Sequence, residues 1–331
     1  MSARTRYLVI ASLLVLTVGL GTGLVAHYVG LPAIQQHPGP AELEFVPRAA
    51  AIVAYADVRA VMASELRQKL RRAMPAQENR RREFEDATGI NVETDIDHVV
   101  ACVNPQDAGN GPASGLVLAR GVFNEAKIEA LMRDRGARVD LYKDKRIIVG
   151  EAGPRHDSLA LAFIEPGLVA IGNERVLRAV IDLQRGGDNV TNNQDVMRLV
   201  RALDSPNAWA VGRFDALQST AMLPPAVAKQ VPAITWFSIG GRVTDGLDGV
   251  VRAEARDGDA AKNLREVVRG FVALAKLQAG ANPQLQSMIQ SLDIGGDDKT
   301  VSLTFSVSGV MIDSLGVIVQ PQSPNPPIEL R

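Results

Sequence analysis

The residues with catalytic or metal-binding side chains are few and widely spaced in this sequence. The chain has four histidines and one cysteine, and His98 and Cys102 fall on one face of the same expected strand. Four residues at about 3.3 Å each place them roughly 13 Å apart, whereas a thiol–imidazole pair requires hydrogen-bond contact. We therefore expect Cys102 to be a small buried core residue and not a nucleophile.

Three further candidates, His156, Asp157 and Ser158, are consecutive. Neighbouring side chains point in different directions, and a catalytic triad brings its residues together from separate elements, so this run does not predict a site. The sequence also lacks the nucleophile-elbow, zinc-protease, phosphate-loop and dinucleotide motifs. A hydrolase assembled from distant residues stays an alternative, which a cleft holding His98 or His156 beside a carboxylate and a hydroxyl would support.

Two acidic pairs offer oxygen ligands for a cation, Asp95 with Asp97 and Asp297 with Asp298. Neither pair approaches the about six to eight oxygens that Ca²⁺ takes, so solvated loops are the simpler interpretation. We assign no catalytic residue, no metal ligand and no cofactor-binding residue. The sequence favours a protein without enzymatic activity.

One cluster of basic residues lies on and just after the first expected amphipathic helix. Its members are Arg67, Lys69, Arg71, Arg72, Arg80, Arg81 and Arg82. The functional interpretation is contact with anionic lipid headgroups or with an acidic partner, helped by tethering close to a membrane. The alternative is a solvated helix face on which Glu65, Glu83 and Glu85 supply counter-charges.

An apolar segment near the N-terminus decides where the rest of the chain would lie. Residues 8–26 carry no charged side chain, and at about 1.5 Å per residue a helix of this length spans roughly 28 Å, close to the ~30 Å hydrocarbon core of a bilayer. Arg4 and Arg6 precede it and the next cation is Arg48, so the positive-inside rule places the N-terminus in the cytoplasm. The sequence predicts an uncleaved anchor over 7–29 of a single-pass inner-membrane protein; a cleaved signal peptide is the alternative.

Small residues in the predicted anchor bear on oligomeric state. Gly19 and Gly23 stand four residues apart, a spacing that lets two transmembrane helices approach closely. They are a possible dimerisation face, and a homodimer is possible on this basis. The alternative is that Gly is common in such helices.

Composition excludes two classes of protein. The chain has 36 Lys and Arg against 37 Asp and Glu, a balance that argues against nucleic-acid binding. Because Cys102 is the single cysteine, no intrachain disulfide can form, which excludes a small disulfide-stapled scaffold.

An internal repeat organises the part after the anchor. Residues 47–57 read PRAAAIVAYAD and residues 206–215 read PNAWAVGRFD, each an apolar strand followed by an apolar-periodic helix. A strand leading into a helix follows in both copies, with Asn124 as a helix N-cap in the first. The second such helix begins near residue 259, and its stripe from Leu264 through Phe271 to Leu274 is expected to be buried. The pattern predicts an α+β fold with two related copies of an antiparallel sheet, each covered by helices.

The expected organisation follows from these segments. It comprises a cytoplasmic tail (1–6), the anchor (7–29), an extended proline-rich linker (30–44), the first copy (45–187), a connector (188–204), the second copy (205–317) and a flexible tail (318–331).

The stretch FVPRAAA at 45–51, opening into a strand that ends Tyr55-Ala56-Asp57 behind an anchor and a proline-rich spacer, resembles uncharacterised bacterial single-anchor envelope proteins carrying a domain of unknown function. The resemblance implies a membrane-tethered two-part α+β ectodomain and brings no catalytic residues. We expect a non-enzymatic scaffold or interaction protein of the cell envelope, with envelope proteins or anionic lipid as partners. A binder of lipid or another apolar ligand is the alternative, through the apolar faces of 264–271 and 301–307.

Overall fold

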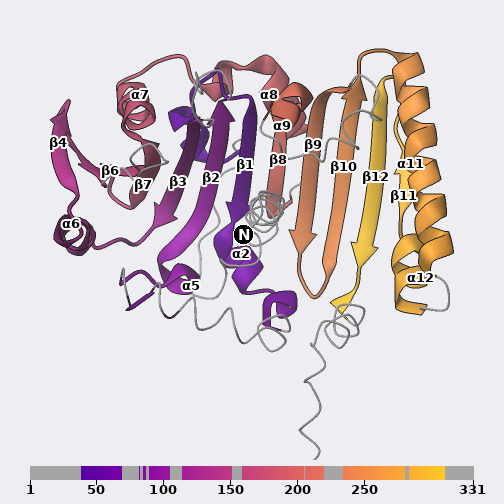
Figure 1. Cartoon of the computed structure of the whole chain (residues 1–331), viewed down its shortest axis with the longest axis horizontal. Coiled ribbons are helices and arrows are strands. Elements are labelled where there is room, and N and C mark those ends of the chain that lie inside the picture. The colour runs from indigo at the N-terminus through magenta and orange to yellow at the C-terminus, as the bar shows by residue number, and fades with distance from the viewer. Residues whose placement is uncertain are drawn as a thin grey trace, which may run out of the picture.

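The computed structural model describes residues 39–68, 82, 85–86, 89–104, 114–150, 159–204, 206–219, 234–279 and 283–309. Within these ranges the strands form one broad sheet with helices packed along it (Figure 1). The predicted anchor over 7–29, with Gly19 and Gly23, lies outside the described residues, and so does the predicted tail over 318–331. No helix of the described part is long and apolar enough to span a membrane.

Over the described residues the sheet has twelve strands, and every neighbouring pair is antiparallel. In spatial order they are β11 (Asp293–Gly295), β12 (Thr300–Val307), β10 (Leu247–Ala255), β9 (Ile234–Val243), β8 (Ala208–Arg213), β1 (Ile52–Asp57), β2 (Ile96–Asn104), β3 (Ser114–Gly121), β7 (Leu168–Asn173), β6 (Leu159–Glu165), β5 (Lys145–Val149) and β4 (Arg138–Tyr142). The α+β class is therefore present, but the prediction of two separate sheets is wrong.

The seam between the two copies explains this correction. β1 pairs with β8 from Ile52 opposite Gly212 to Ala56 opposite Ala208. All of β8 except Arg213 is buried, so both faces of this strand are already covered. Two separate sheets would have left β1 and β8 as apolar open edges, which are prone to pair with other strands. Pairing them with each other removes both edges.

Several helices lie along the sheet, and part of their order recurs in its two halves. They are η1 (Ala41–Phe45), α2 (Val58–Met62), α5 (Val92–Asp95), α6 (Glu125–Asp134), α7 (Glu174–Gln184), η3 (Val190–Asn192), α8 (Gln194–Arg201), α9 (Phe214–Ser219), α11 (Gly258–Ala279) and α12 (Pro283–Gln290). The order β1–α2–β2–β3–α6, with the short α5 before β2, is matched by β8–α9–β9–β10–α11. The repeat read from the sequence thus corresponds to two halves of one sheet.

Asparagine side chains cap the N-termini of five of these helices, namely α5, α6, α7, η3 and α8. Asn124 accepts from the Lys127 backbone N–H at 3.0 Å, as predicted for α6. Asn173 and Asn193 do the same for α7 and α8. Such a cap satisfies one of the backbone donors that the first turn leaves unpaired.

The two faces of the sheet are covered by different segments. Because side chains alternate along a strand, Val53 faces the largest core, which holds Leu118 of β3 and Leu177 of α7. Ile52 faces the opposite side, against Phe214 of α9. At the far end of the sheet, α11 packs on β10 and β12 through a smaller cluster.

The predicted linker over 30–44 ends earlier than expected. Ala41–Phe45 forms η1, in which Leu43 is buried, and the Val46 that follows it is buried as well. These apolar side chains pack into the largest core, because the surface of β2 and β3 beneath them is also apolar. The connector over 188–204 likewise contributes η3 and α8 to this core.

Candidate functional site

Glu42, in η1, is a buried carboxylate that lies between two basic side chains. Its side chain is 3% exposed and lies above β2 and β3. Glu42 Oε2 is 2.8 Å from His98 Nε2, and Glu42 Oε1 accepts from Arg120 Nε at 2.7 Å. Arg120 Nη2 also donates to Glu165 Oε1 at 2.6 Å. We call these four residues the Glu42 cluster.

Strand register brings the cluster together. His98 of β2 lies opposite Arg120 of β3 in the antiparallel pair, and directly opposed side chains stand about 5 Å apart at their Cβ atoms. Both side chains therefore point from the same face of the sheet. η1 crosses this face, and it places Glu42 between a guanidinium and an imidazole.

The cluster holds Glu42 ionised. Burial raises the pKa of this carboxyl, but the hydrogen bond and charge of His98 and the hydrogen bond from Arg120 outweigh burial and lower the pKa to about 2. Hydrogen bonds to the charged form favour it. The Arg120 guanidinium is stabilised in return, since Glu165 and Glu42 raise its pKa against the effect of burial.

A phenol borders the cluster. The Tyr55 ring lies 5.8 Å from the His98 ring and stacks 5.7 Å from the Trp209 ring, centroid to centroid. Burial, followed by the charges of Asp57 and Glu42, raises the pKa of the Tyr55 hydroxyl. The phenol therefore stays protonated at neutral pH and is a poor nucleophile.

These positions bear on the hydrolase alternative. His98 does lie beside a carboxylate, as that alternative requires, but Nε2 already bonds Glu42, and both Glu42 oxygens are occupied. Cys102 is buried in β2 among apolar residues. His156, Asp157 and Ser158 lie outside the described residues. The geometry is that of a closed ion-pair network that fastens η1 to the sheet.

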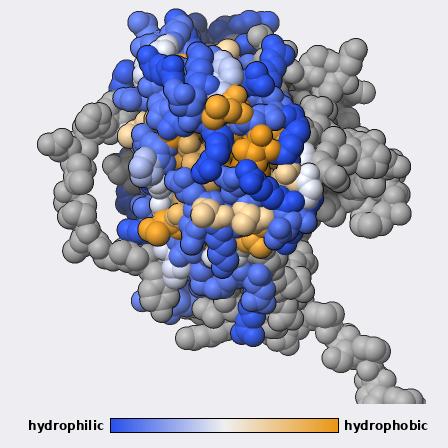
Figure 2. All heavy atoms as spheres, turned by 90° about the vertical axis from the view of Figure 1, so that its left-hand side faces the viewer, coloured by the Kyte–Doolittle hydropathy of each residue, from blue (hydrophilic) through white to orange (hydrophobic). Residues whose placement is uncertain are grey.

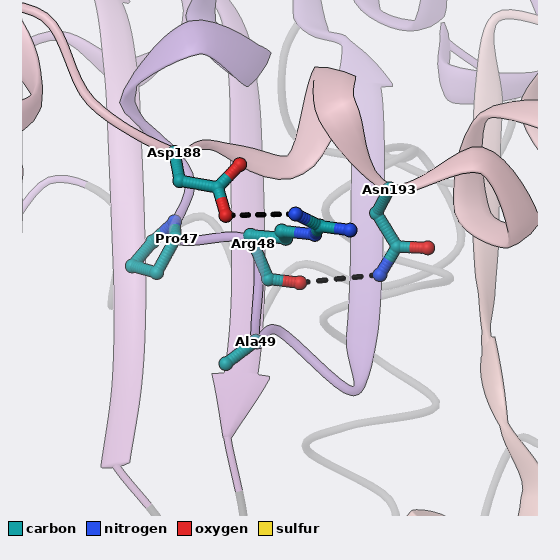
Figure 3. Close-up of a pocket in the computed structure, with 5 residues that line it drawn as sticks. All are labelled: Pro47, Arg48, Ala49, Asp188 and Asn193. Atoms are coloured by element: carbon teal, nitrogen blue, oxygen red, sulfur yellow. Dashed lines mark hydrogen bonds and ion pairs between the residues drawn. The ribbon is translucent and has the colours of Figure 1, made fainter.

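An open hollow lies where the connector returns to the start of the first copy (Figure 3). Its lining residues are Pro47, Arg48, Ala49, Asp188 and Asn193. Arg48 Nη1 bonds Asp188 Oδ2 at 2.8 Å, and Asn193 Nδ2 donates to the Arg48 carbonyl at 3.2 Å. The Arg48 guanidinium also lowers the pKa of Asp188. Opposite charges are thus neutralised within the hollow, which leaves it little to offer a charged ligand.

A second open hollow, of about 550 Å³, lies at the opposite end of the seam, between α2 and the β9–β10 turn. Its lining residues are Ala60, Ala63, Ser64, Glu65, Asn207, Arg242, Val243, Thr244 and Asp245. The Asn207 side chain bonds both backbone groups of Val243 at 2.9 Å. Asn207 is therefore engaged in holding the strand end.

The predicted basic cluster is described only at its two ends. Arg67 is largely buried and donates to Glu93 at 2.7 Å and to the Met62 sulfur at 3.3 Å, so the structure places it inside the protein and not at a contact surface. Arg82 is exposed. The remaining members, Lys69, Arg71, Arg72, Arg80 and Arg81, lie outside the described residues.

The first of the two acidic pairs has protein partners. Asp95 accepts from the Asn91 backbone N–H and from the Thr94 hydroxyl, and Asp97 forms an ion pair with Arg59. Asp297 and Asp298 lie in the β11–β12 turn. Among the side chains that the structure describes, no three His, Cys, Asp or Glu residues gather as a metal site.

Part of α11 departs from the sequence expectation. Leu264 is buried against Val301, as predicted. Phe271 and Leu274 were expected on the same buried stripe, but both are half exposed, and Leu277 is 79% exposed. Phe271 comes seven residues, about two turns, after Leu264 and so lies on the same side of the helix; its exposure shows that close contact with β10 and β12 ends before this turn. Leu274 and Leu277 follow at steps of three residues, which carry them progressively away from that side.

Comparisons with known proteins give little to add to this geometry. No protein-family model matches the chain, and no curated protein matches it. Among solved structures, "Structure of crystal form I of TP0453" is similar with a TM-score of 0.47 and 8% identity, covering 87% of this chain and 100% of that chain. A likeness at this level carries no argument about function.

Proposed function

We propose that this chain is a membrane-anchored extracytoplasmic protein of the cell envelope that acts by binding another protein and not by catalysis. The observation that carries the proposal is the closed state of the Glu42 cluster. Its carboxylate, imidazole and guanidinium satisfy one another, whereas a catalytic acid or base must be within reach of a substrate proton. The network instead gives rigidity, which a binding scaffold needs.

Two further features support a scaffold. The seam between β1 and β8 joins both halves into one continuous sheet, so the surfaces of the two copies are held in fixed relation. The sequence predicts an anchor over 7–29 and basic residues close behind the linker. A tether of this kind raises the local concentration of any partner on the same membrane.

The test is affinity purification of the full-length protein from its native membrane after mild cross-linking. The comparison is a variant in which Arg71, Arg72, Arg80, Arg81 and Arg82 are changed to Gln. A matched control changes five exposed arginines of the α6 and α7 region to Gln, namely Arg133, Arg135, Arg175, Arg178 and Arg185. We expect one specific envelope protein with the parent and the control, and several-fold less with the variant. No protein above background with the parent would contradict the proposal.

A second candidate, binding of lipid, is favoured by one observation, the exposed apolar side chains on the second half of α11. An environment-sensitive fluorophore on Leu277→Cys, in the full chain reconstituted into liposomes, tests it. A matched label goes on the exposed Ala126 of α6. Quenching of the first label alone by spin-labelled lipid would support this candidate, and equal exposure of both labels to water would exclude it.

A further inference from the structure

The strand β4 ends the sheet with an open edge. Among the strands that the structure describes, it is hydrogen-bonded to β5 alone, and it lies at the left-hand end of the molecule in Figure 1. The opposite end is closed differently, since β11 has three residues and α11 and α12 lie beside it (Figure 1). An unpaired edge presents a row of backbone donors and acceptors to any other strand.

The edge is accessible. Figure 2 looks directly onto this end of the molecule, whose surface is mostly hydrophilic with small apolar patches. On β4, the Leu141 side chain is 74% exposed and the Arg138 side chain is 56% exposed. Nothing in the described structure shields these side chains from a partner.

The β4–β5 hairpin decides which backbone groups face outward. Its turn consists of Lys143 and Asp144, both with positive φ, and Tyr142 lies opposite Lys145. In such a two-residue hairpin the closing pair exchanges hydrogen bonds, and hydrogen-bonded pairs then alternate along the strands. Tyr142, Asp140 and Arg138 therefore bond to β5, which leaves the N–H and C=O groups of Val139 and Leu141 pointing to the open edge.

In one antiparallel register, the outward backbone groups of β4 meet the outward backbone groups of a second β4. Centred on Val139, it places Val139 opposite Val139 of a second copy and Leu141 opposite Ala137 of that copy, so outward groups meet outward groups. The same register places Arg138 opposite Asp140 of the second copy, and Asp140 opposite Arg138 of that copy. Opposite charges across a strand pair stabilise it, and like charges oppose it. Non-hydrogen-bonded pairs such as this one hold their side chains closest.

We propose that β4 pairs with β4 of a second copy of this chain, antiparallel and centred on Val139, and so joins two twelve-stranded sheets across a two-fold axis. Charged side chains usually protect an open edge from pairing. Here Arg138 and Asp140 are placed so that two copies of the edge attract each other. Centring the pair on Leu141 would instead set Asp140 against Tyr142 and lose both ion pairs. The self-association is distinct from the partner binding proposed above, so either can fail alone.

The present partners of Arg138 do not prevent the exchange. Arg138 bonds Glu174 at 2.6 Å and contacts Asp140 of its own strand. Its exposed guanidinium can keep the bond to Glu174 while it also binds Asp140 of the second copy. A pairing of five residues buries less than the about 1,600 Å² of a standard stable interface. We therefore expect a dimer that is weak in dilute solution and favoured when two copies share a membrane.

Cysteine substitution in the full chain tests the register. Val139→Cys places two thiols at the two-fold axis, within the Cα separation of about 4.4–6.8 Å that a disulfide needs. Leu141→Cys is the matched control: it is more exposed, but its symmetry mate lies four residues away along the pair, roughly 13 Å. With the chain reconstituted into liposomes and mildly oxidised, we expect a disulfide-linked dimer for Val139→Cys and several-fold less for Leu141→Cys. The unsubstituted chain, whose Cys102 is buried, gives the baseline.

Charge reversal tests the ion pairs. Asp140→Arg should reduce the yield of the Val139→Cys dimer several-fold, because arginines then oppose each other, and adding Arg138→Asp should restore it. Thermal unfolding of each variant separates loss of pairing from loss of fold. Equal cross-linking at 139 and 141, no cross-linking at 139 in folded protein, or failure of the double reversal to restore the yield would each overturn the proposal. A dimer of the full chain in which the thiols at 139 stay unlinked would also overturn it. Contact through Gly19 and Gly23 would give such a dimer.

Discussion

The two halves of the sheet share an order of strands and helices but differ in what they bury. The first half encloses the Glu42 cluster beneath η1 and packs the largest core. The second half packs a smaller cluster beneath α11, and its ion pairs, such as Arg198 with Glu254, lie nearer the surface. The first half is covered by α7 and by segments from outside the repeat, η1 from the predicted linker and η3 and α8 from the predicted connector. The comparison teaches that the repeat determines strand pairing, whereas the added segments determine where charge can be buried.

The largest difference is expected between two carboxylates. Glu42→Ala leaves the His98 and Arg120 groups without their shared partner in a buried site, and breaking such a pair costs about 3–5 kcal/mol. Glu254→Ala breaks a partly exposed pair with Arg198, which costs about 0–1 kcal/mol. Chemical denaturation of both variants measures the two losses. Equal losses would mean that the first half does not depend on its cluster.

Acid should reveal the same asymmetry. The pKa of Glu42 is lowered in the folded state from 4.5 to about 2, so its contribution to stability is fully present above pH 4.5 and is lost as pH falls towards 2. The loss is about 3 kcal/mol. Unfolding free energies measured across this window should fall less steeply in Glu42→Gln, whose side chain does not titrate. Parallel curves for parent and variant would contradict the assignment.

Apolar truncation compares the two ends of α11. Leu264→Ala removes a buried contact with Val301 and should cost about 2–4 kcal/mol, through lost burial and the cavity that remains. Leu277→Ala, at an exposed position of the same helix, should change stability by less than about 0.5 kcal/mol. A loss at Leu277 as large as that at Leu264 would show that a partner covers this position under the assay conditions.

The smallest difference between the two halves is expected at their helix caps. Asn173 caps α7 in the first half by accepting from Val176 N–H at 2.9 Å, and Asp257 accepts from Ala260 N–H at 2.8 Å at the start of α11. Replacement of either by Ala should cost about 1 kcal/mol. Thermal unfolding of the two variants should give similar shifts, and Gly in place of Ala should cost less at both positions.

Local pattern was enough to find many of the strands and helices. The apolar stretches at 47–57 and 206–215 predicted strands, which are present as β1 and β8, and Asn124 was recognised as a cap. The pairing of β1 with β8 could not be found in the same way, because register between strands so far apart in sequence leaves no periodic signal. It follows instead from burial on both faces of β8, which the structure shows.

The Glu42 cluster was hidden by its surroundings in the sequence. Glycine and proline residues around 38–40 read as a linker, although Leu43, Phe45 and Val46 behind them carry apolar side chains suited to a core. In the sequence Cys102 is the reactive side chain nearest to His98 on the same strand, whereas the partner of His98 in space is 56 residues away. On α11, periodicity identified the helix but did not show where contact with the sheet ends, since that depends on how far β10 and β12 extend.

The seam also has a consequence for biosynthesis. Roughly 150 residues separate the end of β1 from the start of β8, and ribosomes add about 5–20 residues per second. For on the order of 10–30 seconds, the nascent first half therefore has one edge of the apolar strand β1 unpaired. During that interval a holding chaperone, or the first half of another nascent chain, competes for the place that β8 will take.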